Sequence, residues 1–518
     1  MKNRCGEAKP PEQGARPRNI RLFFALLIVA ILHCAVFQAR AAEKLTILHV
    51  NDFHGRVFPF AERSAGRVNQ MGGAAYLAAM IEAQRARNPR GSVLLSAGDM
   101  FQGTPVSDLF QGKPVLEMMN ALRFDAMTLG NHEFDWGRAA LDGIIRSAAF
   151  PVLSANVVDR TTGTCLGGVK PYIIVERKGV KIAVIGLTTP ETAYATKAEN
   201  VRGVAFLDPA GVLPGLLAET RQRGAKLIVL LTHLGLDEDI RLAASVSGID
   251  VIVGGHSHTV VRDPVVVGQT IVVQAGCYGL YLGVLELTVD EKTGRIEAAT
   301  KKAELKPVSA GPQDPFDARI ARIAEGYREK INDVFQQVVG ETRVALTRRD
   351  DGESLLGDVV ADAMRTSANA EIAMQNSGGI RADIPKGRIT MEQVYMALPF
   401  DDLLVSMDLA GSTLVDLLEK SIAGNKGVLQ VSGIDVSYDA AGKRVAGARV
   451  AGAALDRSRM YRIVTNDFLA TGGDRFGDFR KGRNISYGGP VRDAFIAHLK
   501  RHSPLAPRIE GRIAITGK

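Results

Sequence analysis

The sequence has few cysteines, and it has no long apolar segment after residue 41. Four of its 518 residues are cysteine, which excludes a small scaffold held together by disulfides. It has no repeat of fixed period and no low-complexity tract. Its large hydrophobic fraction, 46%, lies in short apolar runs. Such a chain is too long for one ordinary core and too apolar to be disordered, so we expect two or three domains of mixed α/β structure.

The formal charge of +8 suggests an anionic macromolecular partner until the N-terminus is considered. Three arginines precede an apolar run over residues 22–37, and residues 39–41 are Ala-Arg-Ala, the small-x-small form of a secretory cleavage site. Residues 1–41 contain seven Lys or Arg and two Asp or Glu, so their removal lowers the formal charge from +8 to +3. We therefore predict a signal peptide over residues 1–41 and no nucleic-acid partner.

An uncleaved membrane anchor is the alternative for this segment. Its 16 residues are short for a bilayer span, which needs about 20. Cleavage would leave a periplasmic or extracellular protein with no stable membrane partner. It would also leave only Cys165 and Cys277, whose pairing the sequence leaves open.

Short apolar runs rich in β-branched residues recur between residues 44 and 305 and predict buried strands. These runs cover residues 45–50, 93–96, 126–129, 182–187, 227–231, 251–253 and 271–273. Helix periodicity lies between them, at residues 74–87 and 209–223.

The composition changes after Pro307. Residues 309–312 are Ser-Ala-Gly-Pro, and a charged segment with helix periodicity then extends from residue 315 to about residue 339. Helix patterns follow at residues 355–367 and 412–423. We therefore predict a first domain over residues 42–310, a connecting helix or hinge over 311–340 and a second domain over 341–518.

Polar residues directly follow five of the predicted strands. They are Asn-Asp-Phe-His at 51–54, Gly-Asp at 98–99, Gly-Asn-His-Glu-Phe-Asp at 130–135, Thr-His at 232–233 and Gly-Gly-His-Ser-His at 254–258. Ligands of open α/β sheets bind beyond the carboxyl ends of the strands, so we expect one convergent site. Carboxylate, imidazole and carboxamide groups suit a divalent metal, and the absence of cysteine argues against a structural zinc site.

Each motif alone has an ordinary structural explanation. An Asp at a strand end often caps a turn, and a single residue such as His233 can be a core histidine. Bulky polar clusters directly after buried strands cost stability without partners. Their joint occurrence therefore favours a shared metal site.

Together, Asp52-x-His54, Gly98-Asp99, Gly130-Asn131-His132-Glu133, His233 and Gly255-His256-x-His258 resemble the signature of the calcineurin-like metallophosphoesterases. The resemblance implies a four-layer α/β/β/α sandwich and two divalent ions, of Zn, Mn, Co or Fe. It implies that one ion is held by Asp52, His54, Asp99 and His258, and the other by Asp99, Asn131, His233 and His256. Asp99 would bridge them. In 5'-nucleotidase relatives the position of His258 is often Asn or Gln.

Two further residues resemble the catalytic dyad of this superfamily. His132 corresponds to its non-ligand histidine, which stabilises the transferring phosphoryl group, and Asp135 corresponds to the partner of that histidine. The expected reaction is hydrolysis of a phosphoester by a metal-activated water. No protein nucleophile is needed.

Three loops in the second half are polar, glycine-rich or aromatic, at residues 376–381, 398–400 and 466–474. Singly they are common turn or core sequences. Together they resemble the C-terminal substrate-binding domain of bacterial 5'-nucleotidases, a separate α+β domain. The resemblance implies that Phe400 and Phe468 stack on the nucleobase, Asp474 accepts from the ribose hydroxyls, and Asn376 with Arg381 positions the substrate.

The resemblance covers about residues 44–510 and implies an exported 5'-nucleotidase acting on small nucleotides, as a monomer or weak homodimer. It departs from some relatives at residues 352–358, where they carry arginines, and at Asp401 and Asp402, where they carry neutral residues. Enzyme alternatives are a 2',3'-cyclic nucleotide phosphodiesterase with 3'-nucleotidase activity, a UDP-sugar hydrolase and a thiosulfohydrolase. A catalytically dead nucleotide-binding protein is the alternative from another class.

Overall fold

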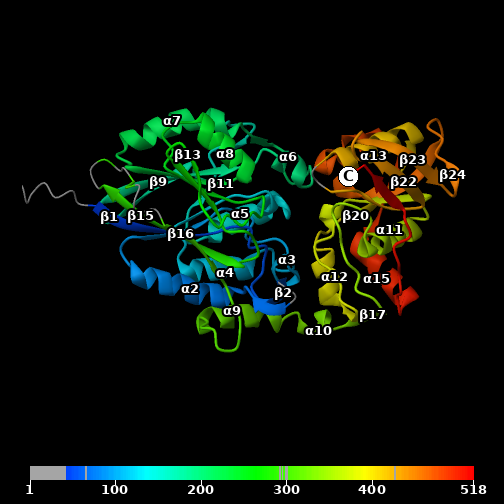
Figure 1. Cartoon of the computed structure of the whole chain (residues 1–518), viewed down its shortest axis with the longest axis horizontal. Helices are drawn as coiled ribbons and strands as arrows, with labels where there is room; N and C mark the ends of the chain where they lie inside the picture. The colour runs from blue at the N-terminus through cyan, green and yellow to red at the C-terminus, as the bar shows by residue number, and fades with distance from the viewer. Residues whose placement is uncertain are drawn as a thin grey trace, which may run out of the picture.

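The computed structural model describes residues 42–64, 67–290, 293, 296–297, 302–424 and 427–517. The predicted signal peptide, residues 1–41, lies outside the described residues. Figure 1 shows the N-terminal half of the chain on the left and the C-terminal half on the right. None of the helices within the described ranges has the length and hydrophobicity needed to cross a membrane.

Two six-stranded sheets form the centre of the N-terminal half. The first consists, in spatial order, of β16 (Lys302–Pro307), β15 (Tyr281–Asp290), β1 (Ala42–Val50), β4 (Ser92–Ser96), β5 (Ala126–Thr128) and β6 (Val152–Leu153). The second consists of β13 (Val265–Val267), β14 (Thr270–Gln274), β12 (Val251–Gly254), β11 (Leu227–His233), β9 (Val180–Thr188) and β8 (Tyr172–Arg177).

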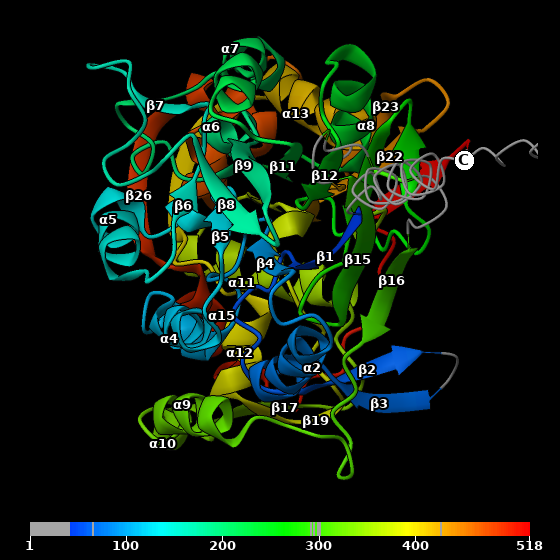
Figure 2. The same cartoon turned by 90° about the vertical axis from the view of Figure 1, so that its left-hand side faces the viewer.

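Strand alternation gives each sheet two apolar faces. In β1, Leu45 and Ile47 pack in the core between the two sheets, whereas Leu48 and Val50 pack against helices. The first sheet is covered by α2 (Ala74–Arg87), α4 (Lys113–Leu122) and α5 (Gly137–Ser147), and α9 (Ala318–Arg328) packs against α2 and α4. The second is covered by α7 (Pro209–Gln222) and α8 (Leu236–Ser245). The predicted four-layer α/β/β/α sandwich is therefore confirmed, and Figure 2 shows the two helical layers above and below the sheets.

The C-terminal half has its own sheet and two cores, as a separate α+β domain requires. The sheet consists of β21 (Gln430–Ser432), β18 (Ile372–Gln375), β25 (Met460–Asn466), β20 (Leu403–Ala410) and β26 (Arg483–Pro490). One core includes α11 (Leu355–Ala368), α12 (Met391–Ala397) and α15 (Val491–His502), and the other includes α13 (Gly411–Ala423). A smaller sheet is formed by β24 (Ala453–Ala454), β23 (Arg444–Val450), β22 (Ile434–Asp439) and β27 (Ile513–Thr516).

Several short elements complete the described chain. In the N-terminal half they are β2 (Phe60–Ser64), β3 (Arg67–Met71), α3 (Pro105–Asp108), η1 (His132–Phe134), β7 (Val157–Asp159), α6 (Thr192–Ala195) and β10 (Val204–Phe206). In the C-terminal half they are η3 (Ser377–Gly379), β19 (Gly387–Thr390), α14 (Asp467–Ala470), η4 (Gly473–Arg475) and η5 (Gly477–Lys481).

The connection between the halves differs from the single helix expected over residues 315–339. It contains α9, then α10 (Asn332–Phe335), and β17 (Val338–Thr342) already pairs with β19. Ile331 leaves the helical conformation, with φ −122° and ψ −7°, and it is buried with Phe335 in the core of the N-terminal half. Tertiary packing therefore interrupts a helix that the charge pattern alone would continue.

Strand direction brings the predicted site residues to one edge. β1, β4 and β5 are parallel neighbours, with Val50 beside Ser96 and Ser96 beside Met127. β11 and β12 are also parallel, with Leu231 beside Val253. The polar residues that follow these strands therefore emerge together at the carboxyl ends of the two sheets.

Candidate active site

Five of the predicted metal ligands have an unusual backbone conformation. Their φ angles are positive: 49° at Asp52, 50° at His54, 51° at Asp99, 78° at His256 and 56° at His258. A non-glycine residue in this region costs about 1–3 kcal/mol, and such residues concentrate at functional sites. The sharp turns aim each side chain back across the ends of the strands.

The first group of predicted ligands is Asp52, His54 and His258, whose ligand atoms all lie within 4.8 Å of one another. His54 Nε2 is 3.1 Å from His258 Nε2, and His258 Nε2 is 3.3 Å from Asp52 Oδ1. Asp52 and His54 are buried. Asn51 donates from Nδ2 to Asp52 Oδ2 at 2.7 Å and so fixes the carboxylate.

The second group is Asp99, His233 and His256, with Asn131 beside it. His233 Nε2 is 3.0 Å from Asp99 Oδ2 and 3.3 Å from Asn131 Oδ1. The two groups are adjacent, because Asp99 Oδ2 is also 4.0 Å from His54 Nε2. Likewise, Asp52 Oδ1 is 4.0 Å from His233 Nε2. The structure therefore brings all seven predicted ligands together, and the carboxylates of Asp52 and Asp99 both face a histidine of the other group.

Backbone carbonyls orient two of the imidazole rings. His54 Nδ1 is 2.9 Å from the carbonyl oxygen of Gln102, and His233 Nδ1 is 2.7 Å from that of Ala97. A proton on Nδ1 satisfies these contacts and leaves the Nε2 lone pair facing the carboxylates. This is the arrangement in which histidine binds a metal ion.

The electrostatics of the site also fit a pair of cations. Burial and the neighbouring His258 lower the pKa of His54 well below its usual range. Burial opposes ionisation of Asp99, but His233 and His132 outweigh it and lower the pKa of Asp99 well below 3.8. Burial opposes protonation of His233, but Asp99 and Asp52 outweigh it and raise the pKa of His233 to about 9. The buried carboxylates thus attract positive charge, and carboxylates with imidazoles are a donor set for a divalent metal.

Glu133 is a supporting residue to which the sequence analysis assigned no role. It is 1% exposed, and its carboxylate accepts the backbone N–H groups of Asp99, Met100 and Gly130 at 2.9, 2.9 and 2.7 Å. Burial and the Asp99 charge raise the pKa of Glu133 to about 7. Glu133 thus ties the loop after β4 to the loop after β5, and its place in the Gly-Asn-His-Glu motif was the available signal.

His132 and Asp135 form the predicted dyad. His132 Nδ1 is 2.6 Å from Asp135 Oδ2, and the backbone N–H of His132 donates to Asp99 Oδ1 at 2.9 Å. Burial opposes protonation of His132, but Asp135 and Asp99 outweigh it and raise its pKa. The ring is therefore oriented, and it can hold a proton beside the metal ligands.

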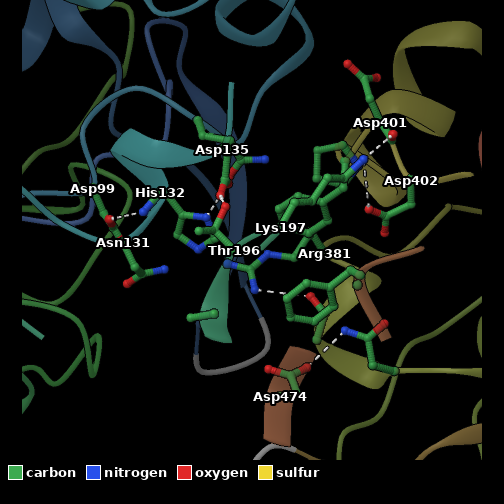
Figure 3. A pocket seen from close by; sticks show the side chains of 18 of the residues that line it. Asp99, Asn131, His132, Asp135, Thr196, Lys197, Arg381, Asp401, Asp402 and Asp474 are labelled. Carbon is green, nitrogen blue, oxygen red and sulfur yellow. Dashed lines mark hydrogen bonds and ion pairs between the residues drawn. The ribbon is translucent and has the colours of Figure 1, made fainter. Parts of the chain in front are cut away.

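A cavity of about 260 Å³ joins the two halves of the chain. From the N-terminal half it is lined by Asp99, Asn131, His132, Asp135, His256 and His258. From the C-terminal half it is lined by all five predicted substrate residues, Asn376, Arg381, Phe400, Phe468 and Asp474. Figure 3 shows His132 and Asp135 facing Arg381 and Asp474 across this cavity. Asp52, His54 and His233 do not line it.

Residues of the C-terminal half approach the dyad closely. The Phe400 ring stacks on the His132 ring, with centroids 5.9 Å apart and planes 22° apart. The Arg381 guanidinium lies 6.0 Å from the centre of the Phe400 ring. Asn376 donates from Nδ2 to Asp474 Oδ2 at 3.1 Å. An aromatic ring, a cation and a carboxylate thus face the metal groups across one space.

Other residues of this region had no clear sequence signal. Gln102, Thr196 and Lys197 line the same cavity, but they belong to loops without a distinctive motif. Asp402, at a position where some relatives carry a neutral residue, also lines this cavity. The two remaining cysteines, whose pairing was left open, are both free thiols.

Comparisons with known proteins agree with this geometry. Residues 45–260 match the family described as calcineurin-like phosphoesterase, and residues 338–481 match the 5'-nucleotidase C-terminal domain. The trifunctional nucleotide phosphoesterase YfkN of Bacillus subtilis is 31% identical over 90% of this chain. The chain spans 35% of the length of that protein.

Two relatives match over nearly their whole length. The snake venom 5'-nucleotidase of Crotalus adamanteus is 32% identical, over 94% of this chain and 92% of its own. The crystal structure of a 5'-nucleotidase precursor from Thermus thermophilus superposes with a TM-score of 0.85 and 34% identity, over 92% of this chain and all of that one. The matches to both domain families, the two groups of metal ligands and the shared cavity all agree. The chain therefore belongs to the 5'-nucleotidase family of metal-dependent phosphoric ester hydrolases, in which a calcineurin-like phosphoesterase domain is joined to a 5'-nucleotidase C-terminal domain.

Proposed function

We propose that this chain is an exported 5'-nucleotidase that hydrolyses nucleoside 5'-monophosphates to nucleoside and phosphate. One observation carries the proposal. The cavity between the halves is lined on one side by metal-binding groups and a histidine-aspartate dyad, and on the other by two aromatic rings, an arginine and a carboxylate. Such a cavity suits a ligand with a phosphate at one end and a flat base at the other.

In this proposal one divalent ion is held by Asp52, His54, Asp99 and His258, and the other by Asp99, Asn131, His233 and His256. Zn, Mn, Co and Fe all suit this mixture of oxygen and nitrogen ligands. When bound, two such ions supply Lewis acidity and a hydroxide from water at neutral pH. The chain's own contribution is to orient the ligands, through Asn51, Glu133 and the carbonyls that accept from His54 and His233.

His132 serves as the proton-holding group of the reaction. With Nδ1 engaged by Asp135 at 2.6 Å, its Nε2 is the atom available to the cavity. A proton held there stabilises negative charge on the phosphoryl oxygens or on the leaving ribose oxygen.

The C-terminal half holds the nucleoside. Phe400 and Phe468 stack on the base, Asp474 accepts from the ribose hydroxyls, and Arg381 with Asn376 positions the phosphate end. Stacking is worth about 1–3 kcal/mol per aromatic ring and tolerates any base. We therefore expect loose selectivity among bases.

In this proposal the two domains have different roles. Residues 42–310 carry the metals and residues 341–518 carry the nucleoside site. The connection over residues 311–340, whose α9 packs in the core of the N-terminal half, contains the hinge between them. Residues 1–41 are a cleaved signal peptide that sends the enzyme to the periplasm or the outside, where it acts as a monomer or weak homodimer on free nucleotides. Sequencing the N-terminus of the secreted protein checks cleavage after residue 41.

A screen that separates the nucleotide, nucleoside and phosphate products tests the proposed substrate, because opening a cyclic phosphodiester or a pyrophosphate releases no inorganic phosphate by itself. The purified enzyme is stripped of metal, reloaded in turn with Zn, Mn, Co or Fe, and assayed on AMP, 2',3'-cyclic AMP and a UDP-sugar. We expect the highest kcat/KM on AMP with at least one metal. A higher kcat/KM on the cyclic nucleotide or the UDP-sugar replaces the 5'-nucleotidase assignment, and hydrolysis of none of the three excludes it.

A further inference from the structure

Residues 191–200 connect the metal site to the dyad within the N-terminal half, and we call them the strap. The segment includes α6. Glu191 Oε2 is 3.7 Å from Nε2 of His256. The Thr196 hydroxyl donates to Asp135 Oδ1 at 2.9 Å, and Asn200 donates from Nδ2 to the Asp135 carbonyl at 2.8 Å. The strap therefore holds the side chain and the backbone of the residue that orients His132.

The same strap holds the C-terminal half. Lys197 Nζ is 2.9 Å from Asp467 Oδ2 and 4.0 Å from Asp402 Oδ1, and it donates to the carbonyl of Asp401 at 2.8 Å. Figure 3 shows Thr196 directed at Asp135 and Lys197 directed at Asp401 and Asp402. At the other end of the strap, Glu191 pairs with Arg475 at 2.9 Å.

The contacts of Lys197 are not ordinary surface ion pairs. The Lys197 side chain is 23% exposed, and those of Asp402 and Asp467 are 12% and 14% exposed. A partly buried ammonium with three oxygen partners is screened less by salt than an exposed pair. Its contact with the Asp401 carbonyl also lies directly after Phe400, the aromatic residue that stacks on His132.

We propose that the strap couples the position of the C-terminal half to the catalytic dyad. In this arrangement Lys197 and Thr196 are positioning residues. Lys197 fixes the nucleoside-binding half through Asp467 and the Asp401 carbonyl, and Thr196 fixes Asp135 one residue away. Closure on a nucleotide and orientation of His132 therefore occur together, so that the dyad is held in place only once the C-terminal half has docked. The inference rests on the proposed function.

A double-mutant cycle tests the coupling. Thr196→Val removes the hydroxyl at constant shape. Asp467→Asn removes the charge facing Lys197 while keeping an acceptor for the Leu403 N–H, which donates to Asp467 at 2.9 Å. We expect each change to lower kcat on AMP by about tenfold, and the double variant to lose at least threefold less than the product of the two losses. A double loss equal to the product overturns the coupling.

Matched controls and a second measurement keep the outcome clear. Lys500→Met and Thr366→Val, at exposed helix positions, should change kcat by less than twofold.

Small-angle scattering of the free enzyme should show a larger radius of gyration for Asp467→Asn than for wild type, and an equal radius overturns the role of Lys197. If wild type releases no phosphate from AMP, the substrate proposal fails, while scattering and the same cycle on the active substrate still decide the coupling.

A second inference concerns Gln102, which is independent of the strap. Its side chain is 2% exposed and lines the cavity three residues after Asp99. Neither Oε1 nor Nε2 has a hydrogen-bond partner among the described residues. The Gln102 carbonyl is already used by His54 at 2.9 Å, so the backbone position is fixed. A buried amide without partners is destabilising, so a ligand that supplies a partner is favoured.

We infer that the Gln102 amide nitrogen donates to a non-bridging oxygen of the phosphoryl group. The ligand class is a phosphate monoester or free phosphate, both of which present such oxygens to a donor beside Asp99. Gln102 would then be a catalytic residue that touches the substrate. The contact between Gln102 and the phosphoryl group rests on the proposed function only for the identity of the leaving group, which is a nucleoside in that proposal.

Gln102→Met tests this contact at similar size. We expect kcat/KM on AMP to fall about tenfold and inhibition by inorganic phosphate to weaken at least fivefold, with metal content unchanged. Gln222→Met, at an exposed position of α7, is the matched control. Unchanged phosphate inhibition, or loss of a metal ion from the variant, overturns the contact. If AMP is not a substrate, phosphate inhibition of the activity found in the screen gives the same test.

Discussion

At the scale of single residues, the site depends on side chains whose proton positions are set by neighbours. His132 makes its 2.6 Å contact with Asp135 through Nδ1, while its backbone N–H reaches Asp99. His132 can therefore be altered without removing a predicted metal ligand.

We predict that His132→Asn lowers kcat by about 10²–10⁴-fold, the usual contribution of a positioned acid or base. Bound metal should stay at the wild-type stoichiometry, because Asn131 and Asp99 keep their side chains. Steady-state kinetics and elemental analysis check both statements. Turnover equal to wild type contradicts the role, and His502→Asn, at an exposed position of α15, is the control.

A second prediction concerns Asp358, a residue of α11 in the C-terminal half. It is 3% exposed, and burial and Glu353 raise its pKa from 3.8 to about 8, although Arg512 opposes the shift. The other charge facing it belongs to Asp362. The folded state thus keeps a proton on Asp358 that the unfolded chain loses near pH 4, so the free energy of unfolding falls as pH rises from about 4 to about 8.

Asp358→Asn removes this titration. We expect the Tm of the variant relative to wild type to be higher at pH 8 than at pH 5, by about 2–4 °C for each kcal/mol recovered. Thermal unfolding at the two pH values measures the effect. Asp416→Asn, at an exposed position of α13, should show no such difference. An equal change of Tm for Asp358→Asn at pH 5 and pH 8 contradicts the assignment.

At the scale of elements, one arginine organises the loop that carries Phe400. We call residues 398–401 the clamp loop. Arg492, in α15, is 7% exposed. It donates to the carbonyls of Leu398, Pro399 and Phe400 at 2.9, 2.9 and 3.1 Å and to Asp401 Oδ1 at 3.0 Å. Its guanidinium also lies 3.9 Å from the centre of the Tyr395 ring.

Arg492→Lys keeps the charge but loses the planar fork that reaches three carbonyls. We expect KM for AMP to rise about tenfold with a smaller change in kcat, because the aromatic ring that stacks on the base is no longer held. Kinetics on AMP check this, with Arg146→Lys at an exposed position of α5 as the control. An unchanged KM would falsify the role of Arg492.

At the scale of the whole molecule, the proposed reaction requires both halves to close on one substrate. The cavity is lined from both sides, and the connection through α9 and α10 passes along one edge of the interface in Figure 1. Entry and release of a nucleotide therefore require relative motion of the halves.

A reducible link between the halves tests this motion. Glu191 and Arg475, which pair across the interface, are replaced by cysteine and joined with a bifunctional thiol reagent. We expect turnover on AMP to fall at least tenfold after linking and to return on reduction, since product release is blocked. The single-cysteine variants treated alike are the controls, because Cys165 and Cys277 also carry free thiols. Full turnover in the linked enzyme excludes the hinge.

Part of this architecture was predictable from the sequence. Short apolar runs rich in β-branched residues predicted the central strands, and the helix at residues 74–87 was predicted with the bounds of α2. The structure of the connection between the halves was not predictable, because burial of Ile331 and Phe335 interrupts the charged helix expected over residues 315–339. Lys197, Thr196 and Arg492 carry no local motif, so no pattern of spacing could have indicated their contacts.

The sequence by itself determined which chemistry is present, because ligand types and strand ends are local properties of the chain. It also determined the order of the two domains, and it contains the pattern from which we predict an export signal. Only the tertiary structure decided that the two groups of predicted metal ligands are adjacent, that Phe400 stacks on His132, and that the strap contacts both halves. Such contacts join residues that are as many as 284 positions apart, as Arg475 and Glu191 are, and packing rather than local pattern brings them together.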